Sequence, residues 1–143
     1  EAADAVVRAG LGTEMVGLDV TRRLWLPGSA VAKLAAHTAP DARWFASLLG
    51  FYVRCHHEHE GLHGAVINDP LAVALALEPG WGVAERIPIT VDLGDGDDRG
   101  RTAVGSAGDP VVSVYRSIDA GSVHRLLLGH LFGRWLTEAD FGP

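Results

Sequence analysis

The chain has 143 residues, of which 48% are apolar and 21% are charged, and this composition suits one folded domain or a large part of one. The modest charge excludes a disordered chain, and a net charge of −6 without any run of Lys or Arg argues against nucleic-acid binding. No apolar run approaches the roughly 20 residues of a membrane span, and the single cysteine, Cys55, cannot form an intrachain disulfide, so we expect a cytoplasmic protein.

Four elements are predicted before residue 61. Apolar residues at helical spacing indicate a helix over residues 1–9, which Gly10 would end. The short apolar run over residues 15–18 predicts a buried strand. Two further helices follow, one capped by Ser29 and one that begins at Pro40 and continues to residue 60.

The second half of the chain begins with another helix and then changes period. Asp69 and Pro70 open a helix that has no polar face, so it should be buried on most sides. Alternating segments then predict strands over residues 86–93, 101–106 and 110–117, with a polar turn between the first two, and an amphipathic helix over residues 122–136 closes the chain. Strands mixed with helices, with no linker between them, indicate the α/β class over residues 1–143.

One motif in the chain matches zinc proteases. His59, Glu60 and His63 form the string H-E-x-x-H, in which two histidines one helical turn apart bind zinc and the glutamate polarises a water molecule. Here Gly61 and Gly64 interrupt the helix that this geometry needs, and no third ligand follows. A histidine-rich polar helix end explains the string better, and a zinc hydrolase remains a distant alternative.

A second motif is Asn68-Asp69-Pro70. A carboxylate at a helix start followed by proline is most often a cap. The same placement presents a carboxylate at the mouth of a buried helix, where a hard cation or a sugar hydroxyl could bind. Asn68 adds an amide that can donate and accept hydrogen bonds. This motif is therefore the better functional candidate of the two.

The order of these segments resembles the C-terminal part of the inosine-uridine preferring nucleoside hydrolase family. The resemblance runs from Glu1 to about Leu136, through "MVGLDVTRRL", "INDPLAVALALEP" and "ERIPITVDL". It implies an open, mixed-sheet α/β fold, to which the hairpin is an addition. It also implies hydrolysis of the N-glycosidic bond of ribonucleosides to free base and ribose, in purine or pyrimidine salvage, with a calcium ion that binds the ribose hydroxyls and activates water.

The resemblance also implies roles for individual residues. Asp69 matches a calcium ligand of the family. Asn68 stands where many members have a histidine general acid, and an amide cannot deliver a proton. Tyr52 and His56 fall on the segment that covers the base, so His56, or else His59, could replace the missing acid, and Tyr52, His56 and Asn68 are the expected substrate contacts.

The family's N-terminal aspartate cluster, with most of the calcium ligands, has no counterpart in these residues. One carboxylate does not hold calcium, which takes about 6–8 oxygen ligands. We therefore expect residues 1–143 to be the C-terminal portion of a nucleoside hydrolase domain and to act only together with the N-terminal half, as a homodimer or homotetramer. The alternative is a non-catalytic relative that binds a nucleoside or ribose without cleaving it.

Overall fold

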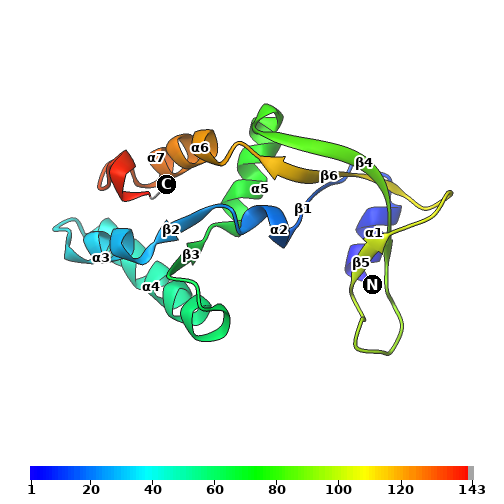
Figure 1. Cartoon of the computed structure of the whole chain (residues 1–143), viewed down its shortest axis with the longest axis horizontal. Coiled ribbons are helices and arrows are strands. Elements are labelled where there is room, and N and C mark those ends of the chain that lie inside the picture. Colours follow the sequence, from blue (N-terminus) through cyan, green and yellow to red (C-terminus); the bar gives the residue numbers. More distant parts are fainter. Residues whose placement is uncertain (142–143) are drawn as a thin grey trace. The chain divides into compact units, whose positions relative to one another are not determined.

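A computed structural model describes residues 1–141, which form two compact units (Figure 1). The first unit combines residues 1–17 with residues 83–117, and the second combines residues 18–82 with the segment from residue 118 onward. Over the described residues, no helix has both the length and the apolar character needed to cross a bilayer.

The first unit is built on a four-stranded mixed sheet in the order β1-β6-β4-β5. Its elements are α1 (Ala2–Arg8), β1 (Glu14–Val16), β4 (Gly82–Val91), β5 (Thr102–Val104) and β6 (Val111–Ile118). β1 pairs with β6 in parallel and β4 pairs with β5 antiparallel, so the predicted α/β class and the hairpin are confirmed. Its core is the cluster of Val7, Ile89, Val91 and Val112.

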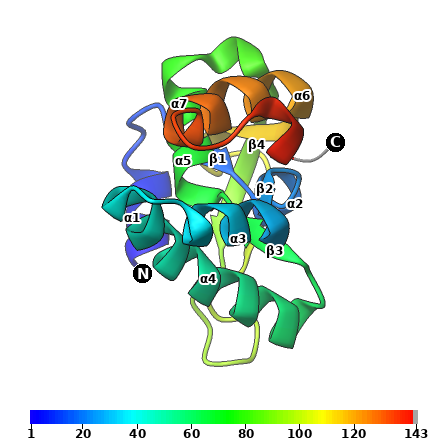
Figure 2. The same ribbon diagram turned by 90° about the vertical axis from the view of Figure 1, so that its left-hand side faces the viewer.

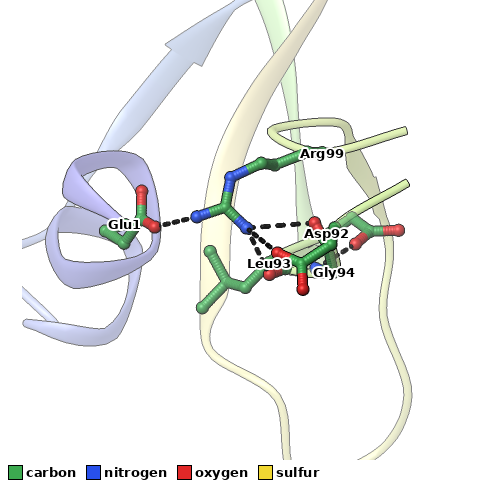
Figure 3. A network of polar contacts seen from close by, with 6 residues as sticks. Glu1, Asp92, Leu93, Gly94 and Arg99 are labelled. Atoms are coloured by element: carbon green, nitrogen blue, oxygen red, sulfur yellow. Dashed lines mark hydrogen bonds and ion pairs between the residues drawn. The ribbon is translucent and has the colours of Figure 1, made fainter. Parts of the chain in front are cut away.

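The polar turn of the hairpin is organised by one arginine (Figure 3). Arg99 donates from Nη1 to the carbonyl oxygens of Leu93 at 2.7 Å and Gly94 at 3.0 Å, and its Nη2 pairs with the carboxylate of Glu1. Asp92 accepts a hydrogen bond from the Gly94 amide at 2.7 Å. Side-chain and backbone groups of the chain thus hold this acidic turn together.

The second unit packs helices around a two-stranded antiparallel sheet, β2 with β3. Figures 1 and 2 both show α3 and α4 side by side. Six leucines are among the largest fully buried side chains of this unit: Leu24, Leu26, Leu34, Leu71, Leu75 and Leu128. In chain order the elements are α2 (Leu18–Thr21), β2 (Trp25–Pro27), α3 (Gly28–Ala36), α4 (Pro40–Glu60), β3 (Gly64–Val66), α5 (Asn68–Leu77), η1 (Pro79–Trp81), α6 (Ala120–Val123), η2 (His124–Leu128), α7 (Gly129–Phe132) and η3 (Glu138–Asp140).

Three features differ from the sequence prediction. Leu18, expected at the end of a strand, begins helix α2 instead, and Asp19 lies in its first turn. The final helix is not uniform, because a π-helical turn, η2, separates α6 from α7. Strands β2 and β3 were not predicted: at three residues each they are too short to show a period.

Candidate functional site

The Asn68-Asp69 pair is positioned by a buried strand. All three residues of β3 are buried, and the amide of Ile67 donates to the Leu24 carbonyl oxygen at 3.0 Å, which fixes the exit of the strand. α5 begins directly afterwards, with Asp69 exposed in its first turn. Within residues 1–141 the Asp69 carboxylate has no hydrogen-bond or ion-pair partner, so it is free to bind a ligand.

Asn68 carries an unpaired polar atom. Its Oδ1 is buried and accepts no hydrogen bond in the part of the chain that the structure describes. The same holds for Oγ1 of Thr21, in α2. A buried polar atom without a partner costs about 1–3 kcal/mol. Asn68 Oδ1 is therefore an unused hydrogen-bond acceptor next to Asp69 in the chain.

Tyr52 and His56 lie together near the C-terminal end of α4. Their ring centroids are 5.7 Å apart, and the Tyr52 side chain is half exposed. Nδ1 of His56 lies 3.2 Å from the Gly64 carbonyl oxygen. Because a carbonyl oxygen only accepts, this hydrogen bond requires a proton on Nδ1.

The H-E-x-x-H string does not form the geometry of a zinc protease. α4 ends at Glu60, Gly61 has a left-handed φ of 69°, and His63 therefore lies outside the helix that carries His59. Glu60 is paired with Arg22 at 3.0 Å, so its carboxylate is already engaged in an ion pair. His59 and His63 therefore do not lie one turn apart on one helix, which argues against a zinc hydrolase.

The Tyr52–His56 pair and the Asn68-Asp69 pair lie at opposite ends of β3. His56 contacts Gly64, the first residue of β3, whereas Asn68 lies two residues after Val66, the last residue of the strand. Gly64 and Asn68 are four residue steps apart, or about 13 Å at the usual rise of a strand. His56 and His59 therefore make no hydrogen bond with Asn68 or Asp69 among the described residues.

The chemistry of a calcium site is only partly present. No group of three or more His, Cys, Asp or Glu side chains in residues 1–141 could hold a metal ion. Asp69 offers one free carboxylate, a ligand type that calcium prefers, but calcium needs about 6–8 oxygens. The described residues therefore offer at most one ligand of such a site.

Comparisons with known proteins identify the family. The family model described as inosine-uridine preferring nucleoside hydrolase matches residues 1–125. The pyrimidine-specific ribonucleoside hydrolase RihA of Shewanella woodyi is 32% identical over 105 residues, which cover 73% of this chain and 34% of that protein. RihA of an Enterobacter species is 40% identical over 80 residues, or 55% of this chain and 26% of that protein.

Solved structures agree with the sequence comparison. A purine-preferring ribonucleoside hydrolase from Gardnerella vaginalis superposes with a TM-score of 0.80 at 26% identity, over 93% of this chain and 43% of that structure. The plant nucleoside hydrolase PpNRh1 shares the fold, with a TM-score of 0.81 at 23% identity, over 92% of this chain and 44% of that structure. The chain thus spans less than half the length of these relatives. It belongs to the inosine-uridine preferring nucleoside hydrolase family.

Proposed function

We propose that this chain is the C-terminal part of an enzyme that hydrolyses the N-glycosidic bond of ribonucleosides, releasing free base and ribose. The observation that supports this most is the free carboxylate of Asp69, presented at the start of α5 by a buried strand, in a chain of the nucleoside hydrolase family. The reaction requires the N-terminal half of the domain, because residues 1–141 offer too few ligands for calcium.

In this proposal Asp69 supplies one calcium ligand. Bound calcium would orient the ribose diol and lower the pKa of the attacking water. Asn68 uses its buried, unpaired Oδ1 to accept a hydrogen bond from a sugar hydroxyl or a base edge. Asn68 and Asp69 are consecutive in the chain, so the calcium ligand and the hydrogen bond from Asn68 can serve one bound nucleoside.

Departure of the base requires a proton that Asn68 cannot supply. Tyr52 and His56 cover the base, and His56, with His59 as second choice, takes the role of general acid. Because His56 contacts the far end of β3 in this conformation, the end of α4 must move toward Asp69 when substrate binds. Without such movement the enzyme favours purines, which other donors or aromatic stacking can activate.

A second candidate function is binding of a nucleoside or ribose without cleavage. The asparagine at position 68, in place of a histidine, favours it. For either function we propose a cytoplasmic homodimer or homotetramer that acts in purine or pyrimidine salvage.

The test is release of free base from inosine, uridine and cytidine, measured with the complete protein and with residues 1–143 alone. We expect calcium-dependent release by the complete protein only, abolished by a chelator and restored by added calcium. Release that a chelator leaves unchanged, or strong release by residues 1–143 alone, would contradict the proposal. Binding without release would favour the second candidate.

A further inference from the structure

The histidine-rich end of α4 holds a pair of rings that the proposed reaction does not use. The ring centroids of His57 and His63 lie 4.6 Å apart, with the ring planes tilted by 36°. Both residues are exposed to solvent. Within residues 1–141 neither ring makes a hydrogen bond or an ion pair, so the ring nitrogens are available to a ligand.

The backbone already holds the two histidines close together. Gly61 ends α4 in a left-handed conformation, and its amide donates to the carbonyl oxygen of His57 at 3.1 Å. This helix end turns the chain back into β3 (Figure 1). The carbonyl oxygen of His63 accepts a hydrogen bond from the amide of Gly28, at the start of α3, at 2.9 Å. A ligand shared by the two rings therefore has to order only their side chains.

The spacing of the two rings suits one metal ion. A metal bound to an imidazole nitrogen at about 2.0–2.1 Å lies roughly 3.2 Å from the ring centroid. At a centroid separation of 4.6 Å, the directions from the metal to the two rings then form an angle of about 90°. Neighbouring ligands form this angle in the square-planar and tetragonal complexes of Cu²⁺ and Ni²⁺, and imidazole suits both ions. Rotation about the side-chain bonds of the exposed rings aims one nitrogen of each at a shared ion.

We propose that His57 and His63 form a binding site for a divalent transition-metal ion that prefers nitrogen ligands, such as Ni²⁺ or Cu²⁺. The site is separate from the calcium ligand proposed at Asp69, and it differs from the zinc-protease string, which would use His59 in place of His57. Only two side chains contribute, since residues 1–141 contain no larger metal-binding group, and water fills the other positions. Half the ligands of a structural zinc site give a Kd on the order of 10–100 µM. The bound ion joins the end of α4 to the segment before β3.

Nickel titration of the untagged complete protein by calorimetry tests this site. Excess calcium in the buffer occupies sites made of oxygen ligands, which nickel would otherwise enter. The wild type is compared with His57→Gln and His63→Gln, and with His59→Gln as the matched control from the same exposed segment. We expect the first two substitutions each to weaken binding about 10-fold or more, because a single imidazole cannot chelate the ion, and the control to change the Kd less than about twofold. Nickel should also raise the Tm of the wild type and of His59→Gln, but not of the other two variants.

The outcomes separate this pair from other nitrogen ligands. No binding up to about 1 mM nickel, or equal binding by all four proteins, overturns the inference. Loss of binding in His59→Gln and His63→Gln but not in His57→Gln overturns it in favour of the H-E-x-x-H pair. If a glutamine variant does not fold, the wild type decides: nickel should protect His57 and His63 from diethyl pyrocarbonate, and modification at an unchanged rate overturns the inference. Nickel binding without hydrolysis refutes only the proposed function, whereas hydrolysis without nickel binding refutes only this site.

Discussion

Gly64→Ala in the complete protein should disrupt the strand that carries the site. A Cβ at position 64 would lie 2.2 Å from Cε3 of Trp25 and 2.6 Å from the carbonyl oxygen of Leu26. The Trp25 ring is partly exposed and can turn away, but the Leu26 carbonyl belongs to the paired strand β2. The strands must then separate by about half an ångström or more, and overpacking of this kind costs about 1–3 kcal/mol.

Thermal unfolding of the complete protein measures this cost. A loss of about 1–3 kcal/mol lowers the Tm by a few degrees, at most roughly 2–4 °C per kcal/mol in a protein larger than 150 residues. Gly129→Ala is the matched control, because a Cβ there meets nothing within 4 Å, and it should stabilise α7 by about 0.5–1 kcal/mol. A Gly64→Ala protein with unchanged Tm and unchanged hydrolysis would refute the close approach of β2 and β3.

Four further variants test other parts of the account. Glu60→Gln should leave kcat within about twofold, because the Glu60 carboxylate belongs to a partly exposed ion pair. Complete loss of activity in this variant would support the zinc hydrolase alternative. His56→Ala should lower kcat for at least one base class, by up to about 10²–10⁴-fold for general acid catalysis, and Asn68→His should raise activity on uridine or cytidine relative to inosine; unchanged kcat for both would exclude His56 as the acid. Lys33→Met should lower the Tm near neutral pH, because the hydrogen bond from Lys33 at 2.5 Å helps to hold the pKa of Asp140 at about 2. A depressed carboxylate pKa stabilises the fold above the unfolded value near 3.8, so the Tm difference should disappear as the pH falls toward about 2; a pH-independent difference would contradict this assignment.

The sequence predicted the long elements because their signals are local. The helix from Pro40 to Glu60 begins at a proline and ends at Gly61, as caps and apolar spacing indicate. The hairpin follows from two alternating segments around a polar turn. Strands β2 and β3 depend instead on pairing between Trp25 and Val66, a contact between segments far apart in the chain that leaves no periodic signal.

Only part of the candidate site could be predicted, because only part of it depends on local sequence. Asp69 could be identified from its helix-start position and from the family pattern. The distance between His56 and Asn68 could not, because it depends on the unpredicted strand β3 between them. The burial of Asn68 Oδ1 also depends on tertiary packing, and no sequence pattern reports an unpaired atom. The apolar surface of α5 was visible in its composition, but the exposure of Val73 and Leu77 on one side was not.

The most direct test of the proposed function is base release by an Asp69→Asn variant of the complete protein, with and without calcium. This substitution keeps the shape of the side chain and removes the charge of one calcium ligand. Metal-assisted stabilisation is worth several kcal/mol, so we expect kcat/KM to fall by about 10²–10³-fold or more, with an unchanged Tm in a chelator. Hydrolysis by Asp69→Asn at the wild-type rate and with the wild-type calcium dependence would contradict the role of Asp69 and the function proposed from it.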